Sequence, residues 1–345
     1  MKFADIGIYK VNDINDIKTA VAGIKVDRID TELYKTDFKA DKDVPFLKVN
    51  GDFVPMTRYA FTELCKELQV PVPVKFAEKV PHTMLSYIVD GLKNTNKEVC
   101  IFTKKDPPCV LHLRKYPSLP LKNTDIMDVC EEMIQQKSLA KCYLSDISLE
   151  VEMREKEGEE IIPGDPHHHA IRVVNSEVGI IGAYAQTGLL RTICWNSALI
   201  SECVRWNYDY RRSYHYNLQD FRTKVFKMKS ESDIIEKIRS SINRKMLDED
   251  IVNTWRTLAR RSSPLHADKI VGIDAESRKH LVSRVTERHR KRSEHYGKPG
   301  LETEMNAYYL SNRITAYARE IQDFQARNDL ERLGGEVLLL ALDKN

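Results

Sequence analysis

The sequence predicts an α+β protein, in which a central antiparallel β meander is followed by a largely helical C-terminal region. Between residues 142 and 194, short apolar stretches either alternate with polar positions or lie between turn residues, as strands do. From residue 217 onward, apolar residues recur every three or four positions, which is the spacing of one helix face. With 345 residues, we expect an N-terminal α/β region over 1–136, a β-rich core over 137–216 and a helical region over 217–345.

Turn and capping residues predict the elements of the N-terminal region. Residues 1–45 are polar, with isolated apolar positions, and are expected to form short strands and loops. Asn50 and Gly51 tolerate positive φ and lie between two apolar runs, so they predict a tight hairpin. Thr57 can cap a following helix. The remaining expected elements are two helices and two strands, over residues 83–93, 124–135, 99–103 and 110–114.

Four strands are expected in the central region, over residues 142–153, 170–175, 180–186 and 189–194. Gly179 and Gly188 mark expected turns, the acidic stretch 155–166 is expected to be a loop, and helix is expected from Trp195 onward. In the C-terminal region the helices are expected to be broken at Ser263–Pro264 and at the last glycine pair, 334–335.

Composition excludes several classes of protein. The chain contains no long apolar run of the kind that spans a membrane, and its first residues lack the apolar stretch of a secretory signal. Its seven cysteines form no CxxC pair, which argues against a disulfide framework and a thiolate zinc site and favours a reducing cytoplasm. The formal net charge of +3 is too small to identify a polyanion-binding protein, so the distribution of charge has to decide.

A basic, aromatic-rich run over residues 205–229 is the strongest functional feature. It holds seven lysines and arginines against two acids, and seven aromatic residues lie between them. Cations neutralise phosphates and aromatic faces stack on unpaired bases, so this combination favours single-stranded nucleic acid. The alternative is that the aromatic residues pack in the core and the charges form its wet face. The predicted contacts are Arg205, Trp206, Tyr208, Tyr210, Arg211, Arg212, Tyr214, Arg222, Lys224, Lys227 and Lys229.

A second basic stretch covers residues 278–298. On a helix, Arg284, Arg288 and Lys291 form one stripe with Arg292 beside it, which suits a phosphate backbone. A solvated helix, or a surface that meets an acidic protein partner, is the alternative.

The remaining polar residues of the sequence predict no catalytic residue, metal site or cofactor. No nucleotide-binding or hydrolase motif occurs. His167, His168 and His169 follow Asp165, but neighbouring positions of a strand point to opposite faces, so at most two histidines converge. A polar loop end, or two histidines near phosphate, is favoured over a metal site.

Two acidic residues and one cysteine leave weaker catalytic alternatives. Glu150 and Glu152 share one face of an expected strand and could hold Mg²⁺ in a nuclease, with Asp165 or His167 as further ligands, although strand-borne acids more often face solvent. Cys194 has no identifiable base beside it, and a buried structural cysteine is the default.

Four stretches together resemble the phage/plasmid-like protein family of bacteriophage genomes and conjugative plasmids: residues 57–81, 109–133, 170–200 and 306–321. The most distinctive block pairs an Asn-Ser-x-x-Gly turn (Asn175, Ser176, Gly179) with an Arg-x-x-Cys-x-Asn element that begins at Arg191. Ser197 departs from the glycine that is commoner in the family. The family carries no established activity, so the resemblance implies an origin in mobile DNA and no catalytic residues.

These observations favour a nucleic-acid-binding protein of phage or plasmid DNA metabolism, which binds or anneals single-stranded DNA in recombination or replication. The cytoplasm of a bacterial host cell is the expected location, and a homo-oligomer is left open. The alternatives are an interaction protein that inhibits a host enzyme or defence system, with a host protein as partner, and a metal-dependent nuclease.

Overall fold

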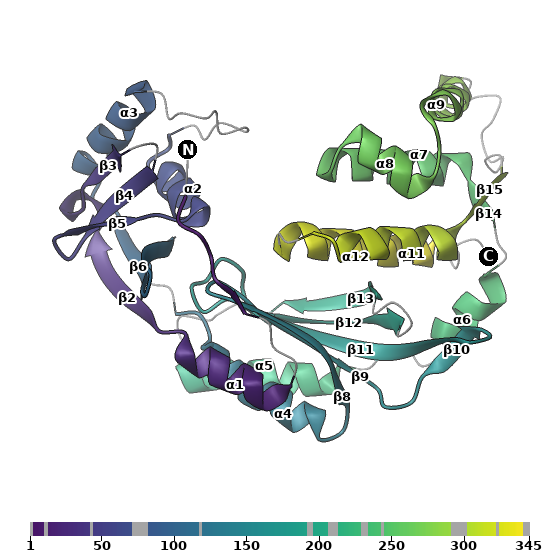
Figure 1. Ribbon diagram of the computed structural model, residues 1–345, viewed down its shortest axis with the longest axis horizontal. Helices are drawn as coiled ribbons and strands as arrows, with labels where there is room; N and C mark the ends of the chain where they lie inside the picture. The colour runs from purple at the N-terminus through teal and green to yellow at the C-terminus, as the bar shows by residue number, and fades with distance from the viewer. Residues whose placement is uncertain are drawn as a thin grey trace. The chain divides into compact units, whose positions relative to one another are not determined.

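The computed structural model describes residues 3–9, 13–41, 44–70, 82–116, 119–191, 196–205, 213–228, 234–242, 245–290, 302–321 and 324–340. Its tertiary contacts divide the chain into two compact units with interleaved segments. Unit 1 holds Met1–Met153, Arg172–Ala185 and Val204–Lys227, and unit 2 holds Arg154–Ile171, Gln186–Cys203 and Met228–Asn345. Antiparallel strands and a helix-rich C-terminal region confirm the α+β class (Figure 1).

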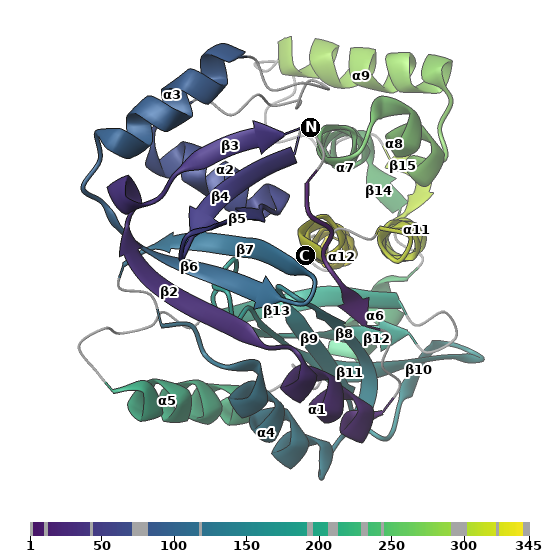
Figure 2. The ribbon, with the colours of Figure 1, turned by 60° about the vertical axis from the view of Figure 1, so that its left-hand side comes forward.

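The N-terminal part of unit 1 contains two small antiparallel sheets and several helices (Figure 2). The first sheet has the order β2-β6-β7, formed by Val26–Glu32, Glu98–Lys105 and Pro108–Lys115. The second has the order β3-β4-β5, formed by Phe38–Asp41, Val44–Val49 and Asp52–Pro55. The short helix η1 and the helices α2 and α3 cover Leu33–Lys35, Arg58–Glu67 and His82–Lys93.

Two local predictions in this part are confirmed. Asn50 and Gly51 take positive φ, 50° and 95°, at the hairpin that joins β4 to β5. Thr57 caps α2, because its hydroxyl accepts a hydrogen bond from the amide of Ala60 at 3.2 Å. Phe61 and Leu64 then lie on the buried face of α2, in the core cluster that β4 and β7 share.

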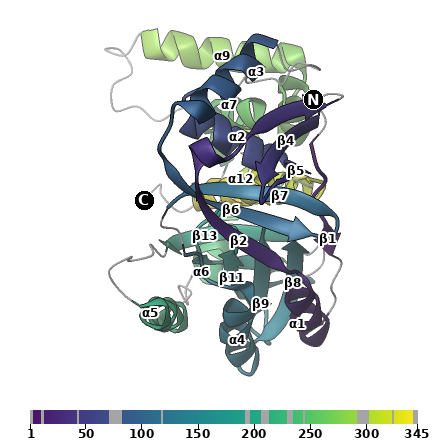
Figure 3. The same ribbon diagram turned by 90° about the vertical axis from the view of Figure 1, so that its left-hand side faces the viewer.

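The expectation of only strands and loops before residue 45 was wrong, because α1 forms over Ile14–Gly23. Asp13 caps this helix by accepting hydrogen bonds from the amides of Asn15 and Asp16, and Ile17 and Val21 are buried. The helix α4, Asn123–Ile134, contacts both α1 and α5, Tyr214–Lys227, and Figures 1 and 3 show the three helices grouped together.

The largest sheet has seven strands, in the order β1-β8-β9-β11-β12-β13, with β10 paired to β11. The strands β11, β12 and β13 contribute residues to both units. Their bounds are Ile8–Tyr9 (β1), Ser138–Ser145 (β8), Leu149–Arg154 (β9), Glu159–Ile162 (β10), Asp165–Asn175 (β11), Tyr184–Arg191 (β12) and Asn196–Arg205 (β13).

Four predictions about this sheet were wrong. The single strand expected over 142–153 is two strands, because the amide of Ser145 donates a hydrogen bond to the carbonyl of Ser148 and closes a turn. Part of the expected loop 155–166 pairs with β11 as β10. Gly188 lies inside β12 and marks no turn. Helix was expected from Trp195 onward, but Asn196–Arg205 form the strand β13.

The C-terminal part of unit 2 is mainly helical, as expected. Its helices are α6 to α9, α11 and α12: Ile234–Ser241, Asp248–Arg261, Pro264–Val271, Ala275–Arg290, Ala307–Ala318 and Phe324–Leu339. A two-stranded sheet, β14 (Lys245–Leu247) with β15 (Glu302–Asn306), interrupts them. The break at Ser263–Pro264 is confirmed, since Ser263 caps α8.

The break expected at Gly334–Gly335 was wrong, because both glycines lie inside α12. A side chain at Gly334 would begin 2.4 Å from the methyl group of Thr315 on α11. The glycine therefore permits close packing of the two helices, which lie side by side in Figure 2. Among the described residues, no helix has the length and apolar character that crossing a membrane requires.

Candidate nucleic-acid interface

Helix α5 carries most of the predicted contacts that the structure describes. Ser213 precedes it, and its hydroxyl accepts a hydrogen bond from the amide of Tyr216 at 3.2 Å. Asn217, Phe221 and Val225 recur at four-residue spacing and are buried. This spacing assigns one face of α5 to the core of unit 1 and leaves the other face to solvent.

The first residue of α5 anchors the helix to α4. The hydroxyl of Tyr214 donates a hydrogen bond to Asp125 and accepts one from the amide of Lys122 at 2.9 Å. Burial raises the pKa of Tyr214, and its hydrogen bond to the Asp125 carboxylate raises it further. The described contacts of Tyr214 are therefore structural, and its hydroxyl stays protonated at neutral pH.

The outer face of α5 presents cations next to aromatic rings. Tyr216 and Phe226 are 47% and 41% exposed, although neither belonged to the predicted contact set. The guanidinium of Arg222 lies 5.8 Å from the ring centre of Phe226 and is 2.5 Å from a carboxylate oxygen of Glu132. The predicted contacts Lys224 and Lys227 are exposed as well.

Lys224 is paired within its own helix. Its ammonium lies 2.6 Å from the carboxylate of Asp220, four residues earlier, and the two side chains are 45% and 33% exposed. Exposed pairs of this kind contribute about 0.3–0.5 kcal/mol, so a phosphate can replace the carboxylate at little cost. The four-residue spacing of Asn217, Phe221 and Val225 was visible in the sequence. It places Tyr216 and Phe226 outside the buried stripe, where their rings can meet solvent.

The described part of the second basic stretch, residues 278–290, lies on α9 in unit 2. Arg284 is half exposed, and its Nε is 3.8 Å from the buried carboxylate of Asp248. Arg278 lies 5.0 Å from the ring centre of Trp255 and pairs with Asp268, so its charge serves the packing of α7, α8 and α9. The side chain of Arg288, and the residues Lys291 and Arg292, lie outside the described part of the chain.

Much of the basic, aromatic-rich run also lies outside the described residues. Arg205 ends β13, and its side chain is not described. The described part of the chain leaves out six further predicted contacts entirely: Trp206, Tyr208, Tyr210, Arg211, Arg212 and Lys229. The candidate interface is therefore built from α5.

The two acids that could serve a nuclease are buried, so the expectation that they face solvent was wrong. Glu150 and Glu152 are 1% and 0% exposed. Arg172 of β11, itself 1% exposed, lies 3.3 Å from Glu150 and 2.9 Å from Glu152, and Lys141 of β8 lies 3.3 Å from Glu152. A guanidinium thus occupies the position between the carboxylates that a metal ion would need.

The first histidine of 167–169 belongs to a buried polar cluster in unit 2. Arg191 of β12 donates from Nε to both carboxylate oxygens of Asp165 at 2.7 Å, and the hydroxyl of Tyr308 on α11 donates at 2.5 Å. His167 lies beside them, with Nε2 3.5 Å from the hydroxyl of Tyr308. Burial lowers the pKa of His167, and Asp165 opposes that shift.

The carboxyl group of Asp165 is ionised in this cluster. Burial acts to raise its pKa, but the hydrogen bonds from Arg191 and Tyr308 outweigh burial and hold the pKa below its usual value. His168 turns to a separate partner, Arg154, with 2.7 Å between the guanidinium and Nε2. The part of the chain that the structure describes contains no group of three or more metal-binding side chains.

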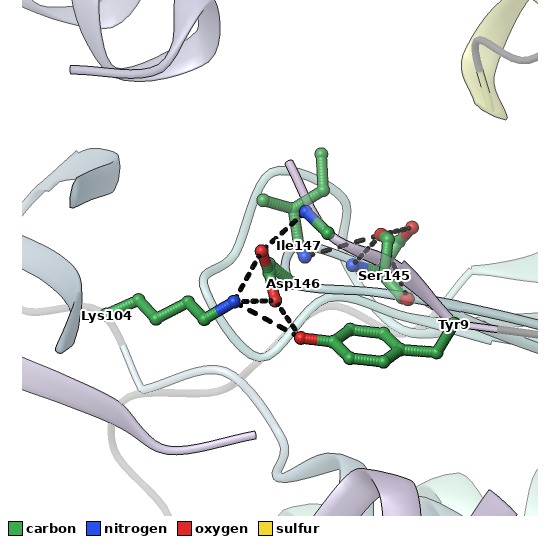
Figure 4. A network of polar contacts seen from close by, with 7 residues as sticks. Tyr9, Lys104, Ser145, Asp146 and Ile147 are labelled. Atoms are coloured by element: carbon green, nitrogen blue, oxygen red, sulfur yellow. Dashed lines mark hydrogen bonds and ion pairs between the residues drawn. The ribbon is translucent and has the colours of Figure 1, made fainter. Parts of the chain in front are cut away.

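A second network of polar contacts, which the sequence analysis did not predict, holds the N-terminal strand of unit 1 in place (Figure 4). Asp146 lies in the turn between β8 and β9 and is buried. Its carboxylate accepts hydrogen bonds from the amide of Gly7 and the hydroxyl of Tyr9, both at 2.7 Å, and pairs with Lys104 of β6 at 2.9 Å. The network therefore joins three elements that are distant in the sequence, and its role is structural.

The Asn-Ser-x-x-Gly turn has a structural role as well. Asn175 donates to the carbonyl of Leu121 at 2.8 Å, next to the start of α4. Ser176 donates to the carbonyl of Ile147 at 2.6 Å. Gly179 takes φ +75°, and a side chain there would begin 2.6 Å from Arg114. The turn thus connects α4, the β8–β9 turn and β7. Cys194 lies outside the described residues.

Comparisons with known proteins add no relative, because no family model, curated protein or solved structure matches the chain.

Proposed function

We propose that the protein binds nucleic acid, with a preference for single-stranded DNA, through the outer face of α5 and the basic segment that precedes it. One observation carries the proposal: α5 buries one stripe of residues, leaves Lys224 and Lys227 exposed together with Tyr216 and Phe226, and leaves Arg222 partly exposed beside them. Cations that meet phosphates and rings that stack on bases are both required for single strands.

A role in the DNA metabolism of a phage or plasmid, such as strand annealing in recombination or replication, extends this proposal. Its support is the resemblance of four stretches of the chain to a family of mobile elements. A homo-oligomer and a place in the bacterial cytoplasm belong to the same proposal. The main alternative is an acidic protein partner, since the exposed cations of α5 suit carboxylates as well as phosphates.

Fluorescence anisotropy with single- and double-stranded oligonucleotides, across a salt series, tests the proposal. The variant Lys224→Ala/Lys227→Ala removes two exposed cations of α5. Its matched control is Lys35→Ala/Lys66→Ala, because these lysines are also exposed in unit 1 and each pairs with a glutamate three residues earlier. Both variants lose the same net charge, so a difference between them reports the location of the site.

We expect the wild-type protein to bind single strands more tightly than duplex, with affinity that falls steeply as salt rises. Each lost phosphate contact on a single strand reduces the slope of log K against log salt by about 0.7, so Lys224→Ala/Lys227→Ala should reduce it by about 1.4. The control should keep the wild-type slope. Equal losses in both variants would contradict the assignment to α5. An absence of binding at low salt would contradict the function and direct attention to a protein partner.

A further inference from the structure

The small sheet β3-β4-β5 has one buried face and one outer face. Leu47 and Val49 of β4 point inward and belong to the core cluster of unit 1. The alternate positions, Phe46 and Lys48, point the other way, and Lys48 is exposed. Phe46 remains half-buried and is not a member of that core cluster. The outer face of this sheet therefore carries apolar rings that the core does not use.

Strand register brings a second phenylalanine and a second lysine into the same patch. Lys39 of β3 lies directly opposite Phe46, and Phe53 of β5 lies directly opposite Lys48. Directly opposed residues of an antiparallel pair project from the same side of the sheet. We call these four residues, Lys39, Phe46, Lys48 and Phe53, the Phe–Lys face.

The ammonium ions of the Phe–Lys face lie over the rings. Nζ of Lys39 is 4.4 Å from the ring centre of Phe53 and 5.4 Å from that of Phe46, and Nζ of Lys48 is 5.8 Å from that of Phe53. A cation over a ring occupies its face rather than its edge. The faces of both rings are thus covered by flexible lysine side chains, which a ligand can displace.

We propose that the Phe–Lys face is a second contact for single-stranded nucleic acid, on which unpaired bases stack on Phe46 and Phe53. A base that stacks on a ring takes the position of the ammonium, and the released ammonium can then pair with the adjoining phosphate. Single-stranded nucleic acid alternates flat apolar bases with anionic phosphates, which matches the alternation of rings and cations on this face. The inference rests on the proposed function and assigns it a separate site.

The charge of this face differs from that of α5. Asp41 lies on β3 two residues after Lys39, and Asp37 lies two residues before Lys39, just ahead of the strand, so two carboxylates accompany the two cations of this face. Phosphates are therefore attracted less strongly here than to α5, and stacking is expected to supply most of the affinity. Loss of the rings should weaken binding without a change in its salt dependence, the opposite of the effect expected on α5.

The variant Phe46→Leu/Phe53→Leu tests the site, because leucine keeps apolar volume and removes the flat ring. Its matched control is Tyr34→Leu/Tyr87→Leu: both tyrosines are exposed aromatic residues of unit 1, and Lys35 lies over the ring of Tyr34 at 5.5 Å. The probes are an oligothymidylate and an abasic oligodeoxynucleotide of the same length. We expect Phe46→Leu/Phe53→Leu to bind the oligothymidylate about tenfold more weakly, with the wild-type salt slope and unchanged binding of the abasic strand. The control should bind both probes as the wild type does.

Photocross-linking of the wild-type protein to a strand that contains 5-iodouracil provides a second measurement that needs no variant. Cross-links at Phe46 or Phe53, located by mass spectrometry, support the site, and their absence from a bound complex overturns it. Wild-type affinity of Phe46→Leu/Phe53→Leu for the oligothymidylate, or an equal loss on the abasic strand, also overturns it. If only Lys224→Ala/Lys227→Ala weakens binding, this inference fails and the proposed function stands. If the wild-type protein binds neither probe, both fail.

Discussion

Arg172 and the cations of α5 show two opposite uses of positive charge in unit 1. Arg172 is 1% exposed and lies between two buried carboxylates. The side chains of Arg222 and Lys224 are 41% and 45% exposed, and each pairs with one carboxylate that is itself exposed by a third or more. The buried guanidinium is bound to the fold, whereas the exposed cations can exchange one anion for another. Burial, rather than the number of basic residues in a stretch, decides which cations can meet a ligand.

The difference between buried and exposed ion pairs also determines how much free energy is lost when one partner is removed. A buried ion pair has lost its hydration, so removal of one partner leaves an uncompensated charge and costs several kcal/mol. An exposed pair is screened by water and salt, and its loss costs less than about 1 kcal/mol. Substitutions at the two kinds of site should therefore separate stability from binding.

The largest effect is expected from Arg172→Met. This change leaves Glu150 and Glu152 buried without the guanidinium, and we expect the free energy of unfolding to fall by about 3–5 kcal/mol. Urea denaturation measures it. The double variant Arg172→Met/Glu150→Gln should recover part of the loss, because the pair of Lys141 with Glu152 remains. A loss under about 1 kcal/mol from Arg172→Met would show that these carboxylates are hydrated. Arg172 would then behave like the exposed cations of α5, and the contrast between the two kinds of site would not hold.

A smaller effect is expected from Tyr308→Phe, which removes the hydroxyl that donates to Asp165. A hydrogen bond to a charged group contributes about 1.5–3 kcal/mol, and we expect a loss of that order at neutral pH. Tyr309→Phe is the matched control, because Tyr309 is the next residue of α11 and is 56% exposed. The control should unfold as the wild-type protein does.

Tyr308→Phe should also change how the stability of the protein depends on pH, and the pKa of Asp165 gives the direction of that change. The pKa of Asp165 in the folded protein lies below its usual value of 3.8, so the cluster adds stability above that pH and loses it as the pH falls through the folded pKa. Without the hydroxyl, the pKa of Asp165 rises. Acid unfolding of Tyr308→Phe should therefore begin at a higher pH than that of the wild-type protein. Acid unfolding at the wild-type pH would show that Arg191 alone holds the carboxylate.

Local features of the fold could be predicted from the sequence, because the interactions that form them are local. The Asn50–Gly51 hairpin and the Thr57 cap depend on residues within three positions of each other, and both are confirmed. The strand β13 was mistaken for a helix because its partner β12 determines its conformation, and periodicity over ten residues does not reveal a partner. Gly334 was mistaken for a helix break because its role depends on Thr315 of another helix.

The candidate site was predictable to the same extent. The basic, aromatic-rich run was recognised from composition, but the choice of contacts within it required the buried stripe of α5, which assigns Tyr214 to an anchor and leaves Phe226 exposed. The Phe–Lys face could not be predicted at all. Its four residues lie on three strands, and only the register of β3, β4 and β5 places them together.

The smallest effect on stability, and the most direct link between the two uses of charge, is expected from Glu132→Gln. This change removes the carboxylate that Arg222 contacts, at side chains 42% and 41% exposed, and should alter the free energy of unfolding by less than about 1 kcal/mol. Because the guanidinium loses an intramolecular anion and α5 loses a neighbouring negative charge, single-stranded DNA should bind a few-fold more tightly. Arg222→Met is the converse variant and should bind more weakly with equally small effects on stability. Anisotropy at low salt measures both. Weaker binding by Glu132→Gln would mean that Glu132 holds the guanidinium of Arg222 in the position that binds DNA. The carboxylate on α4 would then fix a cation in place, as the buried carboxylates do for Arg172.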